Sequence, residues 1–306
     1  MSKVVLFGSG KIGGAVLKRL NSNVLAIIDN DIGKQKNSKK PPVISLAEYK
    51  KNYAGFADVL ICSYRYAHEM EKQLLENNIF NFAFAPEIWE RRSVVEDVEI
   101  SHGNWGSFLE ANFNIPGYDI LEIGSRVVTG ANFRNCFSKA NYVGFDYYEG
   151  SNVDVVGDIH NLSQCFDRKF DLIFSSAVFE HLAMPWKAAL EIIKCLKIGG
   201  YVFIETHYSF TRHEEPWHFF QFSENALHIL FPEKFGMQCI RKGCSNPLVA
   251  RFAEDAAYYL KGKFVKNMYC HSEIFLKKVR EVPSGQLSWD NILLSDVVGS
   301  TEYPKP

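Results

Sequence analysis

Short apolar runs alternate with turn-forming polar segments near the middle of the chain. An apolar run at 119–123 precedes Gly124 and Ser125, and a second run at 142–145 ends in Asp146. Runs of this length predict two strands, and the polar segment between them predicts a helix. Such a unit places a flexible turn and a helix N-terminus at one end of a parallel sheet, with an acid at the tip of the next strand. We therefore expect a ligand that carries a ribose to bind here.

The N-terminal segment shows the same alternation. Residues 3–7 and 24–28 predict strands, apolar positions between them recur at helical spacing, and Asp29 closes the second strand. The turn between them contains a GxGxxG pattern made by Gly8, Gly10 and Gly13. Strand, glycine turn, helix and terminal acid follow in the order of a dinucleotide-binding unit. The three glycines and Asp29 are therefore a predicted second nucleotide site.

Further alternation completes half of a Rossmann fold by residue 88. The expected elements are a helix from Ser45, a strand at 58–62, a helix at 67–77 and a strand at 80–84. The proton-relay pattern Tyr-x-x-x-Lys of short-chain reductases occurs only at Tyr259 and Lys263, far outside this segment. The loop after Asp29 is basic, with lysines at 34, 36, 39 and 40. It is most simply a solvated loop, although its lysines could also contact the phosphates of a ligand.

Composition places a domain junction between residues 89 and 117, where glycine and proline interrupt the pattern and one helix is expected at 107–113. The expected fold is α/β. A small Rossmann-like nucleotide-binding domain at 1–88 is followed, after the linker at 89–117, by a larger doubly wound domain at 118–306. Its last residues, 283–306, are expected to form a tail.

Five short blocks follow one another in the second domain. They are EIGS at 122–125, VGFD at 143–146, GDIH at 157–160, FDLIFSSAVFEHL at 170–182 and LKIGGYVFIET at 196–206. In order and spacing these blocks resemble the class I S-adenosylmethionine-dependent methyltransferases, in particular the small-molecule type 11 group. The resemblance covers roughly residues 118–240. It implies a seven-stranded sheet whose last strand, at 271–279, runs antiparallel.

The resemblance also implies a cofactor site. Glu122 would hold the amino group of S-adenosylmethionine, directly or through water, and the turn at 124–125 would line its methionine end. Asp146 would accept from the ribose hydroxyls and Asp158 from the adenine amine, with the backbone of Ile159 against the ring. The residues implied to bind the cofactor are Glu122, Gly124, Ser125, Asp146, Tyr147, Asp158, Ile159 and Ser175.

The cofactor loop departs from the family pattern E/DxGxGxG at one position. Arg126 stands where the second glycine is expected, and the next glycine is Gly130. A single acid at a strand end is commonly a solvated residue, but three acids in the register of the family favour a site.

Histidines gather where the substrate is expected, beyond the carboxyl ends of the strands. His181, His207 and His213 are candidate bases, because methyl transfer to a hydroxyl releases a proton that imidazole can accept near neutral pH. The alternative for each is a structural hydrogen bond. The residues predicted to shape the substrate pocket are Glu214, Trp217 and His218. No His-x-x-x-His pair or carboxylate triad lies on one element, so no metal site is predicted.

Composition narrows the choice of partners. The 306 residues include 34 basic and 35 acidic side chains, a net charge of −1, so the chain has no overall attraction to nucleic acid or an anionic membrane. No apolar run reaches the ~18 residues that span a bilayer. The N-terminus lacks a secretory pattern, which favours a cytoplasmic location. Seven scattered cysteines without a CxxC pair indicate reduced thiols.

Three functions follow from these patterns. The leading hypothesis is an S-adenosylmethionine-dependent methyltransferase acting on a small molecule, a hydroxyl or amine of a sugar or nucleotide-sugar in polysaccharide biosynthesis. The alternative is an NAD(P)-dependent reductase or nucleotide-binding sensor that works through the N-terminal glycines. A nucleic-acid methyltransferase is disfavoured, because Ser-Ser-Ala-Val at 175–178 stands where enzymes that methylate DNA amines carry Asn/Asp-Pro-Pro-Tyr. The N-terminal domain resembles, in fold pattern, small domains attached to sugar-modifying enzymes of surface-polysaccharide pathways. We expect it to bind a nucleotide or nucleotide-sugar without redox chemistry.

Overall fold

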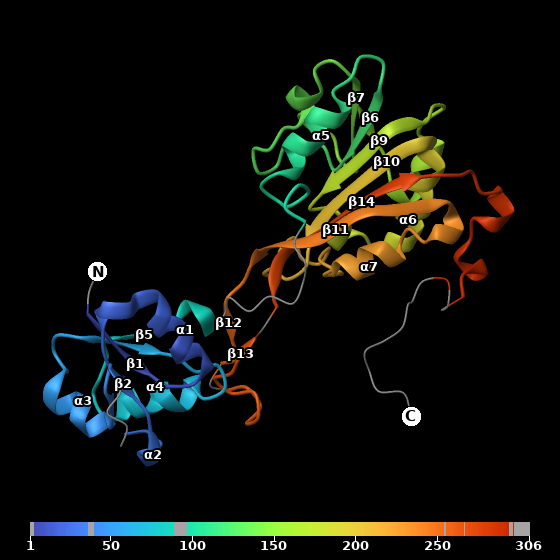
Figure 1. The fold of residues 1–306 in the computed structure, drawn as a ribbon. Coiled ribbons are helices and arrows are strands. Elements are labelled where there is room, and N and C mark those ends of the chain that lie inside the picture. Colours follow the sequence, from blue (N-terminus) through green and yellow to red (C-terminus); the bar gives the residue numbers. More distant parts are fainter. Residues whose placement is uncertain are drawn as a thin grey trace. The chain divides into compact units, whose positions relative to one another are not determined.

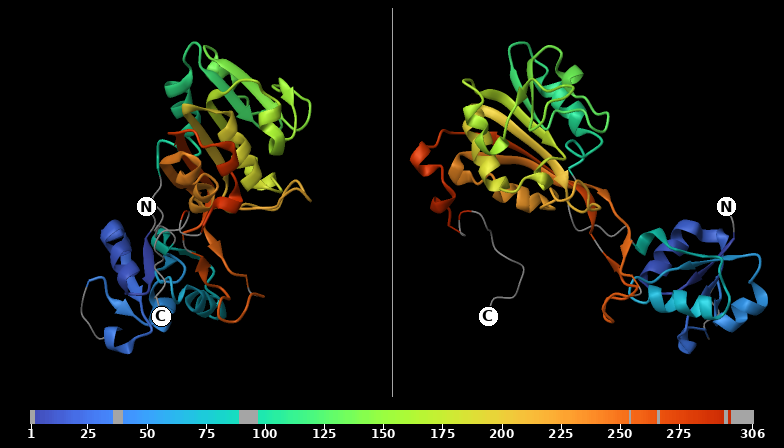
Figure 2. Two further views of the ribbon diagram at one scale, coloured as in Figure 1. Left: turned by 90° about the vertical axis from the view of Figure 1, so that its right-hand side faces the viewer. Right: turned by 180° about the vertical axis from the view of Figure 1, so that it is seen from behind.

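The chain packs into two units in the computed structural model (Figures 1 and 2). The structure describes residues 3–35, 40–88, 97–253, 255–265, 267–293 and 296. The first unit contains the described residues up to 88 together with 249–268, and the second contains the others. Lys36 and Lys39 of the basic loop, residues 89–96 of the predicted linker and most of the end of the predicted tail lie outside the described residues.

Five parallel strands form the sheet of the first unit, in the order β3-β2-β1-β4-β5. The strands are β1 (Val4–Phe7), β2 (Val24–Ile28), β3 (Val43–Ile44), β4 (Asp58–Ile61) and β5 (Phe82–Phe84). The helices are α1 (Lys11–Leu20), α2 (Ile32–Gln35), α3 (Leu46–Asn52) and α4 (Ala67–Glu76), with 3-10 turns η1 (Asn21–Asn23) and η2 (Pro86–Ile88). Every strand and helix expected in this segment is present. Ser45 begins α3 by accepting from the Glu48 amide, while the Glu48 carboxylate accepts from the Ser45 amide.

Two glycines allow α1 to pack tightly against the end of β1. Gly8 has a φ of +108°, which a residue with a side chain rarely adopts. A Cβ atom on Gly13 would lie 2.0 Å from the carbonyl oxygen of Gly8. The GxGxxG pattern is therefore explained in part by backbone packing, as expected for such a turn.

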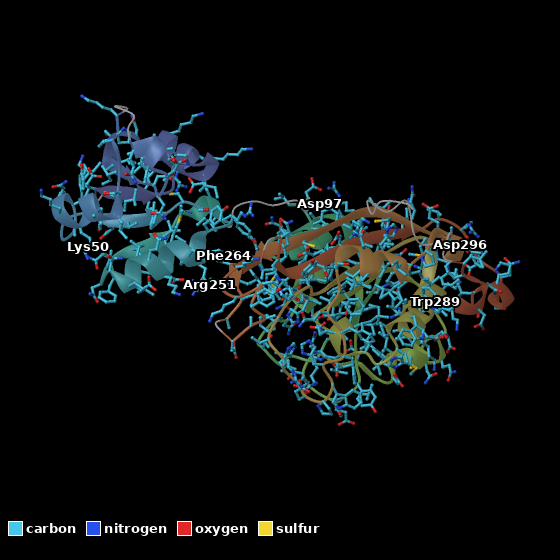
Figure 3. The ribbon with its side chains drawn as sticks, turned by 90° about the horizontal axis from the view of Figure 1, so that it is seen from below. Lys50, Asp97, Arg251, Phe264, Trp289 and Asp296 are labelled. Carbon is cyan, nitrogen blue, oxygen red and sulfur yellow. The ribbon has the colours of Figure 1, made fainter. Side chains whose placement is uncertain are left out.

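A hairpin from late in the sequence also belongs to the first unit. Its strands, β12 (Ala250–Arg251) and β13 (Phe264–Val265), pair antiparallel. The Phe264 ring lies 5.0 Å from that of Phe84 between centroids, and Arg251 pairs with Glu71 of α4. Figure 3 labels Phe264 and Arg251 beside α4 and β5. The sequence-based boundaries place residues 249–268 in the second domain, whereas their contacts group them with the first unit.

Seven strands form the sheet of the second unit, in the order β11-β14-β10-β9-β6-β7-β8. They are β6 (Asp119–Ile123), β7 (Asn141–Asp146), β8 (Val155–Val156), β9 (Phe170–Ser176), β10 (Leu196–His207), β11 (Met237–Pro247) and β14 (Tyr269–Lys278). The last strand, β14, runs antiparallel to both β10 and β11, and the others pair in parallel. This confirms the predicted seven-stranded α/β fold. No helix in the described part of the chain combines the length and apolar character needed to cross a membrane.

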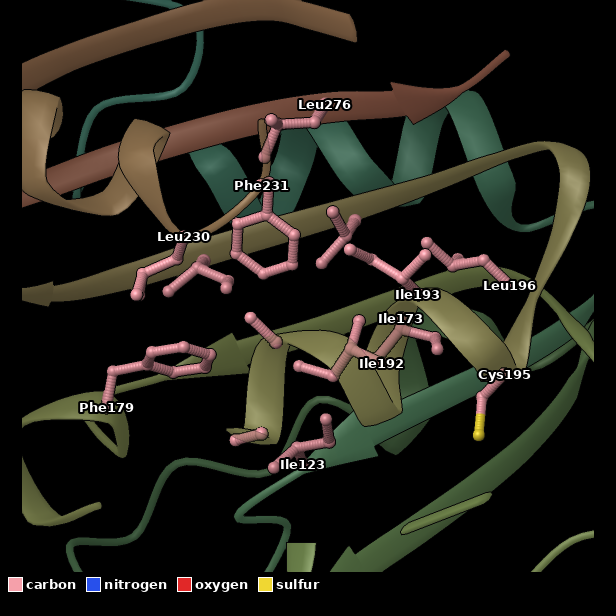
Figure 4. Close-up of a cluster of buried hydrophobic side chains, with 14 of the residues drawn as sticks. Ile123, Ile173, Phe179, Ile192, Ile193, Cys195, Leu196, Leu230, Phe231 and Leu276 are labelled. Carbon is pink, nitrogen blue, oxygen red and sulfur yellow. The ribbon is translucent and has the colours of Figure 1, made fainter. Parts of the chain in front are cut away.

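Apolar side chains alternate between the two faces of this sheet. Ile120 packs with α5 (Trp105–Phe113) on one face, while Leu121 and Ile123 pack with α6 (Pro185–Cys195) on the other. Figure 4 shows part of the second face, where Ile192 and Ile193 of α6 meet Phe231 and strand residues. The remaining elements are α7 (Glu224–Ile229), η3 (Arg134–Phe137), η4 (Ile159–Gln164), η5 (Phe179–His181), η6 (Glu233–Phe235), η7 (Ser284–Gln286) and η8 (Trp289–Asn291).

The prediction of a helix between β6 and β7 is wrong. Only the 3-10 turn η3 forms there, although the segment is long enough for a helix. Val127, Val128 and Thr129 are β-branched, and Gly130 adopts a φ of +93°, so the segment has low helix propensity and no continuous apolar face. Consequently no α-helix N-terminus follows the turn at Gly124.

Candidate active site

The parallel strands β6, β7, β9 and β10 end at one edge of the second sheet, which brings most predicted site residues together. Gly124 turns the chain after β6 with a φ of +78°, and a Cβ there would lie 2.2 Å from Cγ2 of Val178. Ser125 donates its hydroxyl to the carbonyl oxygen of Asn152 at 3.0 Å. A Cβ on Gly144 would lie 2.0 Å from that same oxygen. This turn is therefore tightly packed, and only glycine fits at 124 and 144.

Asp146 ends β7 and holds the turn that follows β6. Its Oδ1 accepts from the Tyr148 amide at 2.9 Å, and its Oδ2 accepts from the Arg126 amide at 3.3 Å. The Arg126 side chain also reaches the carboxylate, with Nε 3.4 Å from Oδ1. The residue that departs from the family pattern thus contacts the carboxylate predicted to bind ribose. Ribose hydroxyls would have to share or displace the contact with the Arg126 side chain.

The other implied cofactor residues lie around the same edge. Asp158 precedes η4 and accepts from the amide of His160 at 2.9 Å, and Ile159 beside it is buried. Tyr147 is exposed. Ser175 near the end of β9 is 1% exposed, yet its hydroxyl forms no hydrogen bond with any described residue. A buried hydroxyl without a partner is unusual in a folded protein, and a bound ligand would satisfy it.

Glu122 is buried under the turn. The Tyr142 hydroxyl donates to its Oε2. Burial raises the pKa of the Glu122 carboxyl to about 7, although hydrogen bonds from Tyr142 and Asn152 and the charge of Arg134 oppose this shift. Its implied contact with the amino group of a cofactor stays a prediction.

Four imidazoles form what we term the histidine cluster: His181, His207, His213 and His218. The ring centroid of His213 lies 4.9 Å from that of His181, 5.2 Å from His207 and 4.6 Å from His218. His181 belongs to η5, His207 ends β10, and the other two lie in the loop before α7. The three predicted catalytic histidines therefore come together. That one of them accepts a proton stays a prediction.

A buried carboxylate lies beside this cluster. Glu180 is 0% exposed, and its Oε2 accepts from the Thr206 hydroxyl at 2.5 Å. Its Oε1 lies 2.8 Å from Nδ1 of His207 and 3.9 Å from Nε2 of His181. Burial favours the protonated form, but the neighbouring His207 and Thr206 outweigh it and hold the pKa of Glu180 below its usual value.

The predicted substrate loop reaches the cofactor side of the edge. The Trp217 ring lies 6.4 Å from the Tyr147 ring, which joins a predicted substrate residue to a predicted cofactor residue. The Trp217 carbonyl oxygen accepts from Nδ1 of His181 at 2.8 Å. Glu214 is exposed and has a φ of +52°. His218 belongs to the cluster, and Trp217 contacts it through His181. The main-chain carbonyl oxygen of Glu214 accepts from the Trp217 amide at 2.8 Å.

A second group of polar residues, around Glu205 and Glu273, was not predicted from the sequence. Nδ1 of His102 lies 2.8 Å from Oε2 of Glu205, and the His102 ring stacks on His271 at 4.0 Å. The Ser245 hydroxyl and the His102 amide both donate to Glu273. These residues are far apart in sequence and meet only because β10, β11 and β14 are neighbours. The one local indication was an acid inside each of two apolar runs, at 205 and 273.

Among the described residues, two groups of three side chains lie close enough together to hold a metal ion. In each group one potential ligand atom per residue lies within 4.8 Å of the others. The groups are Glu180 with His181 and His213, and His102 with Glu205 and His271.

Comparison with known families identifies the chain. The family model described as "Methyltransferase domain" matches residues 66–238, more than half of the chain. The chain belongs to this methyltransferase family. It is therefore an enzyme that transfers methyl groups, as predicted. No curated protein matches it, and the family model gives no support to the alternative of a reductase.

Several solved structures resemble this methyltransferase distantly. The YcgJ protein from Bacillus subtilis is 16% identical over 60% of this chain and all of that chain, with a TM-score of 0.41. The plantazolicin methyltransferase BamL is 17% identical over 57% of this chain and 84% of that chain, with a TM-score of 0.40. Magnesium protoporphyrin IX methyltransferase from Synechocystis PCC 6803 is 13% identical over 57% of this chain and 76% of that chain, with a TM-score of 0.38. The assignment rests on the family model.

The buried Glu122 makes the stability of the methyltransferase depend on pH. Its carboxyl pKa rises from 4.5 to about 7 on folding, so the stability it contributes is present below pH 4.5 and is lost as the pH rises through 7. We predict that Glu122→Gln removes this loss. Between about pH 5 and about pH 8 the wild type should lose on the order of 2 kcal/mol more than the variant in the free energy of unfolding, at about 1.4 kcal/mol per pKa unit.

Urea unfolding at the two pH values measures this difference. Glu110→Gln, which changes an exposed carboxylate in the same unit, should behave like the wild type. Identical pH profiles for Glu122→Gln and the wild type would contradict the prediction.

Proposed function

We propose that the chain uses S-adenosylmethionine to methylate a hydroxyl or amine of a small molecule, a sugar or nucleotide-sugar in polysaccharide biosynthesis in the cytoplasm. The observation that carries this proposal is the contact at one sheet edge between Tyr147, a predicted cofactor residue, and Trp217, a predicted substrate residue. The strand-end acids are the predicted donor site, and the histidine cluster is the predicted acceptor site. A transferase needs its donor and acceptor side by side in this way.

The residues at this edge fit the donor. Asp146 and Asp158 offer carboxylate acceptors at neighbouring strand ends, and Ser175 offers a buried hydroxyl without a partner. The tight turn at Gly124 brings backbone close to the same region. When bound, S-adenosylmethionine supplies a methyl group on a positively charged sulfur.

The histidine cluster fits the acceptor. His181 and His213 donate their Nδ1 protons to the carbonyl oxygens of Trp217 and Thr211, at 2.8 and 2.9 Å. These contacts fix the tautomers so that each Nε2 keeps its lone pair. We propose that one imidazole of the predicted three receives the proton of the acceptor. Positioning of acceptor and donor supplies the rest of the catalysis.

Removing the carboxylate of Asp146 should weaken cofactor binding. We expect Asp146→Ala to lower the affinity for S-adenosylhomocysteine by ~1 to 3 kcal/mol, because the ribose hydroxyls lose their acceptor. Isothermal titration calorimetry measures this effect, and Asp146→Asn tests it with less disturbance of the turn. Asp167→Ala, at an exposed position of the same unit, is the matched control. Unchanged affinity in both Asp146 variants would remove this residue from the site.

Loss of the proton-accepting imidazole should affect turnover alone. A panel of sugars and nucleotide-sugars with radiolabelled S-adenosylmethionine identifies an acceptor. With that acceptor, at least one of His181→Ala, His207→Ala and His213→Ala should lower turnover by ~10²- to 10⁴-fold while the affinity for S-adenosylhomocysteine is unchanged. His228→Ala, outside the cluster, should leave both values unchanged. Full turnover in all three variants would disprove the proposal.

A cleft in the first unit supports a second activity, the binding of a nucleotide or nucleotide-sugar. Its volume is about 570 Å³, within the usual range for small-molecule sites. It lies at the carboxyl ends of β1, β2 and β4, and Gly8, Ser9, Gly10 and Tyr66 line part of it. A Cβ on Gly10 would meet no atom within 4 Å, so the space before α1 is open. No side chain caps α1, which leaves its first amides available to an anion.

Charges in the cleft favour phosphate groups. Lys11 and Arg65 line it, and among the described residues neither forms an ion pair. The Asp29 carboxylate is already engaged by protein groups. Oδ2 accepts from the Ser9 amide at 2.9 Å and lies 3.3 Å from Nζ of Lys34, while Oδ1 accepts from the Asp31 amide. We propose that the diphosphate binds before α1 and that Asp29 shapes the turn.

Lys11→Ala and Arg65→Ala should each weaken the binding of a nucleoside diphosphate roughly tenfold, because each removes a charge-assisted contact. Calorimetric titrations with UDP, a UDP-sugar and ADP measure this effect and rank the ligands. Lys18→Ala, at the exposed far end of α1, should bind as the wild type does. Absence of binding by all three ligands, or reduction of a carbonyl compound by NADH or NADPH, would contradict the proposal.

A further inference from the structure

The Glu180 carboxylate is incompletely satisfied. Its Oε2 has a partner in Thr206, but Oε1 forms no hydrogen bond with any described residue. Nδ1 of His207 lies 2.8 Å away, at ion-pair distance, but neither atom has a hydrogen-bond partner among the described residues. Burying a carboxylate oxygen is costly unless a donor or a cation faces it. This oxygen is therefore suited to a positive group, either a protonated His207 or a bound cation.

Two imidazoles present lone pairs toward this oxygen. Nε2 of His181 lies 3.9 Å from Oε1 of Glu180, while Nδ1 of the same ring donates to Trp217. His213 is held in the same way, with Nδ1 donating to the carbonyl oxygen of Thr211. Histidines that bind metals generally donate their other ring nitrogen to a carbonyl or carboxylate, which fixes the ring and the tautomer. Both rings thus have the second contact of a metal ligand.

We propose that Glu180, His181 and His213 bind one divalent transition-metal ion. Their ligand atoms lie within 4.8 Å of one another. Metal bonds of about 2.1 Å in a tetrahedral site place ligand atoms roughly 3.4 Å apart. The 3.9 Å between Glu180 and His181 is about 0.5 Å longer than this separation, and His213 lies on a loop.

Two imidazoles and one carboxylate favour zinc and its neighbours. Nitrogen donors suit Zn²⁺, Co²⁺ and Ni²⁺, whereas Mg²⁺ and Ca²⁺ prefer oxygen ligands. Three protein ligands leave a coordination position open, as in catalytic zinc sites. The absence of a metal-binding motif in the sequence does not conflict with this, because η5 and the loop before α7 bring the ligands together.

Binding of the ion does not depend on the proposed function, but its use does. If the acceptor binds at the histidine cluster, the ion would polarise the acceptor's oxygen or nitrogen. His207 is not one of the three ligands. Its imidazole therefore stays available for the released proton.

The neighbouring group of His102, Glu205 and His271 is already satisfied. Glu205 accepts from the Ser176 hydroxyl at 2.9 Å through one oxygen and from His102 through the other. His271 lies 3.1 Å from the side-chain amide of Asn246. This group provides the competing location that the experiment must separate.

Metal analysis of the purified chain without a histidine tag tests the proposal. Protein stripped with a chelator is dialysed against Zn²⁺ and analysed for bound metal, and Co²⁺ titration is followed by its visible absorption. We expect one ion per chain. His213→Ala and Glu180→Gln should each weaken Zn²⁺ binding by at least about 100-fold, since loss of even an outer-shell partner costs 10- to 100-fold.

Controls distinguish the location of the ion and the fate of the fold. His228→Ala, outside both groups, should bind as the wild type does. S-adenosylhomocysteine titration of each variant shows whether the second unit is intact, and His213, on a loop, is the variant least able to disturb it. Less than stoichiometric zinc, or unchanged binding in both His213→Ala and Glu180→Gln, overturns the proposal. Loss of zinc in His102→Ala alone places the ion at the competing group and also overturns it. Because metal and S-adenosylhomocysteine are measured separately, failure of this site differs from failure of the proposed function.

Discussion

The buried carboxylate of Glu180 is the constraint on which the site depends. Its side chain contacts Thr206 and His207 at the end of β10. Its main-chain carbonyl oxygen accepts from the amides of Phe219 and Phe220 at 2.9 and 3.2 Å. One residue therefore ties η5 both to the sheet and to the loop before α7. A charge buried in this way must be neutralised locally, so whatever neutralises Glu180 also determines where the histidine cluster lies.

Most of the fold could be predicted from the sequence because strands in this chain are short, apolar and separated by polar turns. The boundaries of β6, β7 and β9 follow from that pattern, and the antiparallel last strand followed from the family resemblance. The prediction of a helix after β6 was wrong because it rested on position alone. The β-branched residues and Gly130 of this segment disfavour a helix. The hairpin at 249–268 could not be predicted, for another reason. Its place in the first unit depends on contacts such as Phe264 with Phe84, which no local pattern reveals.

The positions of the site residues could be predicted only where the order of the strands determines them. Parallel strands end at one edge, so Asp146, Ser175 and His207 had to lie along the same edge of the sheet. What each side chain contacts was not predictable, because that depends on partners far away in sequence. Arg126 on Asp146 and Ser9 on Asp29 are examples, and in both a carboxylate predicted to meet a ligand also holds a turn.

Two buried acids on the neighbouring strands β10 and β14 differ in their protonation. Glu205 and Glu273 face each other across β10 and β14. Burial and the nearby Glu205 raise the pKa of Glu273 to about 8, so Glu273 keeps its proton at neutral pH. The hydrogen bond to Glu205 raises the pKa of His102, which favours an imidazolium beside the one remaining negative charge.

That group therefore needs no further cation, and a divalent ion would have to displace a proton and break existing hydrogen bonds. At Glu180 the side chains within ion-pair distance, among the described residues, are two imidazoles, His181 and His207. An imidazole in its neutral form is a good metal ligand. The charge of a divalent ion is for this reason better accommodated beside Glu180 than beside Glu205.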